Sequence, residues 1–61
     1  MDTMFYDYYG NLWHNLGCGS IECIKVSTCL YIPDTGKQLT QGMILTIDQL
    51  QTALNYRHEN S

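Results

Sequence analysis

The segment IECIKVSTCLYI, from Ile21 to Ile32, is the longest continuous β-strand signal in the chain, and it decides the fold. Its even positions, beginning with Ile24, are nearly all apolar, whereas its odd positions mix polar, cysteine and aromatic residues. This alternation is typical of a strand with one buried face. We therefore predict one strand over 21–32, with the even-numbered side chains in the core and odd-numbered ones such as Cys23 half exposed.

Turn signals flank this segment on both sides. Pro33-Asp34-Thr35-Gly36 fits a reverse turn, because proline presets φ and glycine accepts the last position. The stretch 37–45 then predicts a strand that pairs back on the first, with Gly42 marking a bulge. On the other side, Gly17-Cys18-Gly19-Ser20 predicts a loop, since two glycines fall within four residues.

The first thirteen residues hold five of the seven aromatic residues of the chain. Residues 3–9 predict a strand, and Gly10-Asn11 predicts a two-residue hairpin of the primed type that leads into a second strand over 12–16. Alternation along the first strand gives each face a different set of side chains. One set is Met4, Tyr6 and Tyr8, and the other is Thr3, Phe5, Asp7 and Tyr9.

The C-terminal segment predicts an amphipathic helix. Thr46 is a candidate N-cap residue, and Gln49, three positions later, would complete a capping box. Asp48 in the first turn and Arg57 with His58 in the last turn complement the helix dipole. The apolar stripe of this helix is Ile47, Leu50, Ala53 and Leu54.

Together these elements predict a single small domain over residues 1–61 with an α+β fold, an antiparallel β-meander of three to four strands followed by one C-terminal amphipathic helix. The helix can cover only one face of the sheet. A domain of about this size also buries only about 60% of its unfolded surface, so its own core is marginal. We therefore expect a homodimer, with a second copy joined edge to edge or face to face.

Composition and charge exclude several classes of function. The net charge is −3, from six acidic residues against Lys25, Lys37 and Arg57, and three scattered cations form no basic patch for nucleic-acid phosphates. No apolar run reaches the roughly 18 residues that span a bilayer. The segment Met1-Asp2-Thr3 lacks the positive charge of a secretory signal. We expect no direct nucleic-acid partner, no membrane partner and a location in the cytoplasm of a host cell.

The residues with zinc-ligand chemistry are His14, Cys18, Cys23 and Cys29. Their spacing lacks the C-x-x-C knuckle of structural zinc sites, and a continuous strand would hold Cys23 and Cys29 about 20 Å apart. A Cys–His nucleophile pair would also need an orienting group and a pocket. No glycine-rich phosphate loop is present. We predict no enzyme activity, no catalytic residue, no metal and no cofactor.

Gly36-Lys37 and the run from Gly42 to Leu50 resemble the end of the coactivator-type single-stranded-DNA-binding domains, where a G-I-S-L-T strand leads into a helix beginning E-Q-W. That family implies a homodimer with a basic nucleic-acid face. Because this chain lacks the basic residues, the nucleic-acid function does not carry over, and we assign no family. The layout is also similar to that of small acidic phage inhibitors of host enzymes, which build dimers from a short sheet and a helix.

We interpret the aromatic N-terminal region as a protein-binding surface, because Tyr and Trp bring large rigid area at low entropic cost. The predicted contact residues are Tyr6, Tyr8 and Trp13, with Asp7 and Glu22 as a polar rim. The predicted function is a small non-enzymatic protein–protein interaction module, a phage or mobile-element inhibitor of a host protein. Anti-defence, for example anti-CRISPR, and host-enzyme inhibition are the roles considered. The alternative is a small zinc-stabilised or nucleic-acid-associated regulatory protein.

Overall fold

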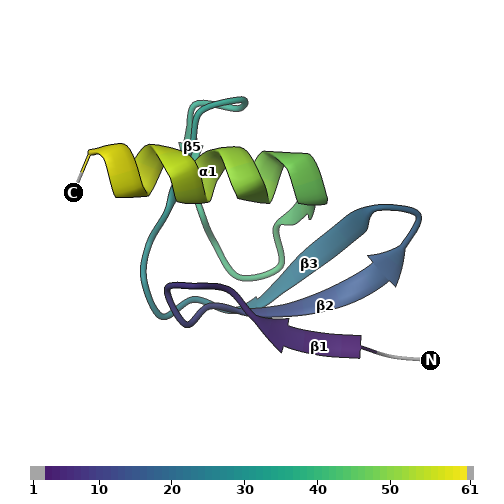
Figure 1. Cartoon of the computed structure of the whole chain (residues 1–61). Helices are drawn as coiled ribbons and strands as arrows, with labels where there is room; N and C mark the ends of the chain where they lie inside the picture. The colour runs from purple at the N-terminus through teal and green to yellow at the C-terminus, as the bar shows by residue number, and fades with distance from the viewer. Residues whose placement is uncertain (1–2, 61) are drawn as a thin grey trace.

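The computed structural model describes residues 3–60 and confirms the α+β fold. The main sheet is antiparallel with strand order β1-β2-β3-β6, β4 and β5 form a separate hairpin, and helix α1 lies across one face of the main sheet (Figure 1). The elements are β1 Thr3–Tyr6, β2 Leu12–Gly17, β3 Ser20–Lys25, β4 Tyr31–Ile32, β5 Lys37–Gln38, β6 Ile44–Thr46 and α1 Ile47–Glu59. Met1 and Asp2, on which the secretory-signal argument depends, lie outside the described residues.

The β1–β2 hairpin is present, but its predicted two-residue turn at Gly10-Asn11 is wrong. The Gly10 N–H donates to the Asp7 carbonyl at 3.1 Å, and the Asp7 N–H donates to the Asn11 carbonyl at 3.0 Å. Gly10 has φ +86°, so the loop is a reverse turn closed by a left-handed glycine. Strand β1 therefore ends at Tyr6, and Tyr8 and Tyr9 belong to the turn.

The β2–β3 hairpin contains the primed turn instead. Its central residues Cys18 and Gly19 both have positive φ, at +55° and +80°. Gly17 and Ser20 face each other across the turn, which confirms the predicted loop. Two consecutive positive φ angles match the right-handed twist of the flanking strands, so this turn joins them without splaying them.

The predicted continuous strand over 21–32 is wrong, because the chain leaves the sheet in its middle. The side-chain Oδ1 of Asn11 accepts the N–H groups of Ser27 at 2.7 Å and Thr28 at 2.9 Å. The Thr28 hydroxyl in turn donates to the Tyr9 carbonyl at 3.0 Å. These bonds tie the first hairpin loop to residues 27–28 and replace the ladder bonds of a strand.

The break also changes which side chains point inward. Ile21 and Cys23 are buried before it, and Leu30 and Ile32 are buried after it. The prediction that even-numbered side chains are buried is therefore confirmed after residues 27–28, at Leu30 and Ile32. It is wrong before them, where Ile24 is only half-buried. The expectation that Cys23 is half exposed is wrong for the same reason.

The predicted single strand over 37–45 is wrong, because β5 and β6 are separate strands in different sheets and Gly42 lies in the break between them, not in a bulge. The turn at 33–36 is confirmed by the N–H groups of Thr35 and Gly36, which both donate to the Ile32 carbonyl. Gly42, with φ +88°, separates β5 from β6 and donates its N–H to the Cys23 carbonyl at 2.8 Å. The β4–β5 hairpin is thus an excursion from the meander between β3 and β6.

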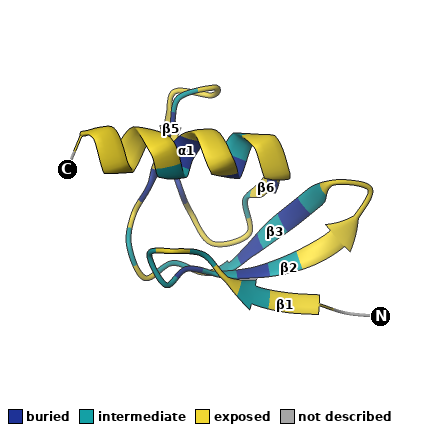
Figure 2. Ribbon diagram, in the orientation of Figure 1, coloured by how far each residue is buried: buried dark blue, intermediate teal, exposed yellow. Residues whose placement is uncertain are grey.

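Helix α1 begins where the sequence indicates. The Thr46 hydroxyl accepts the Gln49 N–H at 3.0 Å and the Gln49 side chain accepts the Thr46 N–H at 2.9 Å, so the capping box is confirmed. Ile47 is half exposed, so the buried stripe is narrower than predicted. Figure 2 shows the buried residues gathered between the helix and the sheet. The core consists of Trp13, Ile21, Cys23, Leu30, Ile32, Leu39, Leu45, Leu50 and Ala53.

Candidate functional site

The strand register separates the main sheet into two faces. Phe5 pairs with Trp13, and Trp13 pairs with the buried Cys23, so this row faces the core beneath α1. Paired residues in an antiparallel sheet point to the same face, and neighbours along a strand point to opposite faces. The adjacent row therefore points away from the helix. It runs across all four strands as Met4, His14, Glu22 and Ile44.

We call the surface on this side the open face, defined as Met4, Tyr6, Leu12, His14, Glu22 and Ile44. The exposed Lys25 pairs with Leu12 at a register irregularity and borders this surface. Three of its large apolar side chains are strongly exposed: Tyr6 at 70%, Ile44 at 59% and Met4 at 48%. Figure 2 shows the helix on the other side of the strands. The open face is therefore an apolar surface that the helix leaves uncovered.

The centre of the open face is polar. His14 lies directly opposite Glu22 across β2 and β3, and both side chains are half-buried. Met4 and Ile44 lie at the two ends of the same row. Glu22 was predicted on a polar rim, and the register places it in the middle of the surface instead.

Sequence reasoning identified Tyr6 and Glu22 on this surface but missed Ile44 and Leu12. The signal for Ile44 was available, because it lies between Met43 and Leu45 in the predicted strand over 37–45 and alternation points it to the opposite face from theirs. Leu12 could have been found only from the pairing partner of Tyr6, since its register with β1 is set by the hairpin loop.

Trp13 is a core residue, and its prediction as a contact residue is wrong. Its side chain has 0% exposure, and its indole Nε1–H donates to Asp7 Oδ2 at 3.0 Å. Tyr8 lies in the first turn with 85% of its side chain exposed. The two tyrosines of the prediction are therefore accessible, whereas the tryptophan supports the sheet from inside.

Asp7 organises the first hairpin loop from within. Its Oδ1 accepts the N–H groups of Tyr9 at 2.9 Å and Asn11 at 3.0 Å. Its Oδ2 accepts the Asn11 side-chain amide at 3.0 Å and the Trp13 indole at 3.0 Å. Both oxygens are thus engaged inside the chain, so the prediction of Asp7 as a polar rim residue is corrected to a structural role. Within residues 3–60, every buried side-chain nitrogen or oxygen has a partner.

Tyr8 borders a second surface, distinct from the open face. Its ring meets Tyr9 edge to face, with centroids 5.1 Å apart, and the Arg57 guanidinium lies 5.6 Å from the Tyr9 centroid. The Tyr8–Tyr9 contact lies within the hairpin loop, and the Arg57–Tyr9 contact connects this loop to α1. Between them is a shallow hollow of about 330 Å³, which we call the tyrosine hollow, lined by Tyr8, Tyr9, Gln51, Leu54, Asn55 and His58.

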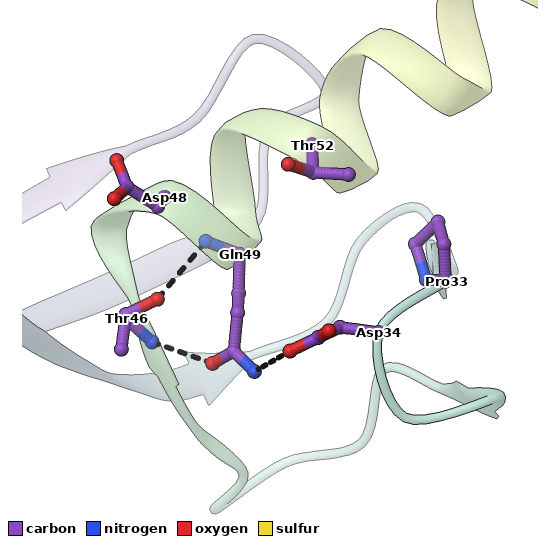
Figure 3. Close-up of a pocket in the computed structure, with 6 residues that line it drawn as sticks. All are labelled: Pro33, Asp34, Thr46, Asp48, Gln49 and Thr52. Carbon is purple, nitrogen blue, oxygen red and sulfur yellow. Dashed lines mark hydrogen bonds between the residues drawn. The ribbon is translucent and has the colours of Figure 1, made fainter.

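A larger hollow of about 560 Å³ lies at the N-terminal end of α1 (Figure 3). The Gln49 side chain is central to it, because it caps the helix through Thr46 and donates to Asp34 Oδ2 at 2.6 Å. Figure 3 shows Gln49 between these two partners, with Asp48 and Thr52 along the helix. The bonds of Gln49 join the helix to the 33–36 turn, which is a structural role.

The three cysteines lie in different environments. Cys18 and Cys29 are exposed thiols, and Cys23 is a buried thiol of the core. Burial raises the pKa of the Cys23 thiol, and the negative charge of Asp7 raises it further. A raised pKa keeps the thiol protonated at neutral pH, which is the unreactive form. Within residues 3–60, no group of three or more His, Cys, Asp or Glu side chains is arranged to hold a metal ion.

Comparisons of the chain with protein-family models, with curated proteins and with solved structures gave no match. In the described part of the chain, α1 is neither long nor apolar enough to cross a bilayer. Inferences about function therefore depend on the surfaces of the chain itself.

Proposed function

We propose that the protein is a small non-enzymatic protein–protein interaction module that binds its partner through the open face. The observation that carries this proposal is the exposure of Met4, Tyr6 and Ile44 on the side of the sheet opposite α1. Large exposed apolar side chains that flank polar groups are typical of interaction sites on small soluble proteins. Tyrosine strengthens such a site, because it contributes a large rigid ring with a polar end.

The polar centre of the open face sets the chemistry of the partner. Glu22 lies opposite His14 between apolar flanks, so a partner that covers this pair meets a polar centre that includes a carboxylate. A hydrogen-bond donor or a positive charge on the partner complements such a centre. The net charge of −3 favours the same choice over longer distances. A complementary partner presents apolar side chains around a central Lys or Arg.

Our proposal for the partner is a host protein that is inhibited in the cytoplasm, with the chain encoded by a phage or another mobile element. It is supported by the small size, the acidic charge and the sheet-and-helix layout. Inhibition needs no catalytic group on the inhibitor, because occupying a partner's surface is sufficient. A host-enzyme inhibitor and an anti-defence factor both meet this description.

The test compares two exposed surfaces of the same molecule. Chain tagged at its C-terminus is used for affinity capture as wild type, as the double variant Tyr6→Ser with Ile44→Ser, and as the single variant Tyr8→Ser. The proposal expects a protein that wild type and Tyr8→Ser retain and that the double variant loses, with all three showing the same thermal unfolding. Loss with Tyr8→Ser alone would place the site at the tyrosine hollow, and equal retention by all three would refute the open face.

A further inference from the structure

Strand β1 forms one edge of the main sheet, and its outer side carries no device that prevents pairing. It is a regular strand, with an unbroken register of four residues against β2. Its sequence, Thr3-Met4-Phe5-Tyr6, holds no charge, no proline and no bulge. Natural sheets usually protect their edges with such devices, because an unprotected edge is a template for another strand.

The hairpin loop fixes which backbone groups point outward from β1. Asp7 bonds to Asn11 through its backbone, and hydrogen-bonded pairs alternate with non-bonded pairs along an antiparallel ladder. Phe5 is therefore bonded to Trp13, whereas Met4 and Tyr6 direct their N–H and C=O groups away from β2. Met4 and Tyr6 thus each present a backbone N–H and C=O on the outer edge of β1. The two residues are two positions apart, which is the spacing at which an antiparallel strand forms its hydrogen bonds.

The opposite edge of the sheet differs. Strand β6 covers only three residues and continues directly into α1. Because hydrogen-bonded pairs alternate along the β3–β6 ladder, the backbone N–H and C=O groups of Ile44 and Thr46 point away from β3. The Thr46 N–H is already bonded to the Gln49 side chain at 2.9 Å. The helix cap therefore occupies one of the outward N–H groups of β6, and within residues 3–60 β1 is the longer and less obstructed edge of the main sheet.

We propose that the protein forms a twofold dimer in which β1 pairs antiparallel with β1 of a second copy, about an axis at Phe5. In this register Met4 lies opposite the partner's Tyr6, and Tyr6 opposite the partner's Met4, so each outward N–H meets an outward C=O. The two sheets become one. No charged side chain of β1 faces another, since the strand has none.

The occupant is a second copy because the strand is complementary to itself. In this register the two Phe5 side chains meet on the core face, and Met4 meets the partner's Tyr6 on the open face. The pairing is isologous, so each β1 edge is covered by the same edge of the partner, and neither edge stays open for a further strand. Because β6 is short and its Thr46 N–H is occupied by the helix cap, we expect assembly to end at two chains and not to continue into a fibre.

The interface is small, since the paired strands are only four residues long. Interfaces below about 1,200 Å² belong to weak or transient complexes. We therefore expect dimerisation to be concentration-dependent. The two open faces would then lie side by side on one sheet, with the apolar Met4 and Tyr6 of both chains at the seam, which gives a partner twice the area that a single chain offers.

The test uses the purified full chain without any partner, so its result is independent of the proposed function. Sedimentation velocity and amide hydrogen exchange are measured from about 10 µM to about 1 mM, a range that brackets weak dissociation constants. The expected result is a rise from one chain mass toward two, together with slower exchange of the Met4 and Tyr6 amides. The Phe5 amide, which faces β2, should exchange at a rate that changes far less with concentration.

Three variants separate edge pairing from other dimers. Met4→Pro removes an outward donor without removing a bond to β2, and Tyr6→Lys places a charge at the edge, so both should remain monomeric. Ile44→Lys places the same charge on the open face away from β1, and it should still dimerise. A wild-type chain that stays monomeric throughout would overturn the proposal, as would a dimer abolished by Ile44→Lys and kept by Tyr6→Lys. Circular dichroism shows whether each variant folds. If Met4→Pro does not fold, the mass of Tyr6→Lys and the amide exchange of wild type decide whether the dimer forms through the β1 edge.

Discussion

Replacing Asp7 by alanine should unfold much of this domain, although Asp7 lies in a surface loop. The substitution removes the acceptor of the Trp13 indole N–H and of the Asn11 side-chain amide, each now bonded at 3.0 Å. Trp13 and Asn11 are both at 0% exposure, so water cannot replace the carboxylate without opening the core. The Asn11 amide also holds residues 27–28 through its oxygen, and a loosened Asn11 weakens that connection.

The magnitude follows from these groups. A buried donor left without an acceptor costs about 1–3 kcal/mol, so two donors cost about 2–6 kcal/mol in total. Natural domains are stable by about 0.05–0.15 kcal/mol per residue, which is about 3–9 kcal/mol for 61 residues. The loss is therefore comparable to the whole stability of the chain. Asp7→Asn should recover only part of it, because its amide would direct N–H groups toward the donors.

Equilibrium urea unfolding, followed by the fluorescence of Trp13 and by far-UV circular dichroism, measures this effect. Asp34→Ala is the matched control, since that exposed carboxylate has one bond, to Gln49, and its loss should cost less than about 1 kcal/mol. An Asp7→Ala variant whose free energy of unfolding lies within about 1 kcal/mol of wild type would refute the structural role of Asp7.

Three further predictions concern the cap, the two faces and the buried thiol. Thr46→Ala should lower the free energy of unfolding by about 1 kcal/mol in urea titrations, because it removes the N-cap acceptor. Ile32→Ala should cost about 2–5 kcal/mol, whereas Tyr6→Ala should change stability by no more than about 0.5 kcal/mol, since the first is fully buried and the second exposed. The folded-state pKa of Cys23 is raised, so the unfolded thiol ionises first and stability should fall as pH rises above the ordinary value of 9.0. Cys23→Ala should lose this dependence in unfolding titrations at alkaline pH, and in the native wild type the two exposed thiols should be alkylated before Cys23.

Features that depend on neighbours in sequence could be predicted from sequence. The capping box of Thr46 and Gln49 involves residues three positions apart, and the turn at 33–36 is encoded by its own proline and glycine. The overall order of a meander followed by a helix also follows from local signals. The Gly10-Asn11 pair favours a two-residue turn, whereas the turn that forms begins at Asp7. Asp7 with Gly10 three residues later is itself a turn signal.

Features that depend on distant contacts could not be predicted in the same way. The strand over 21–32 is broken by Asn11, whose side chain bonds to Ser27, sixteen positions later. Alternation gives two possible faces for each strand, and only pairing decides which is inward. The inward face of β2 contains Trp13 because its partner in β3 is the buried Cys23. Tyr6 was correctly expected to be accessible, whereas Trp13 was not distinguishable from it by composition.

Oxidative footprinting of the complex obtained by affinity capture tests the open face most directly. Met4 and Tyr6 are exposed and oxidisable, and so are Tyr31 and Tyr56, whose rings lie 5.2 Å apart on the side of α1 and β4. We predict that binding protects Met4 and Tyr6 from oxidation and leaves Tyr31 and Tyr56 as reactive as in the isolated chain. Protection of Tyr31 and Tyr56 with Met4 and Tyr6 still reactive would show that the partner binds elsewhere and that the open face is not the interaction surface.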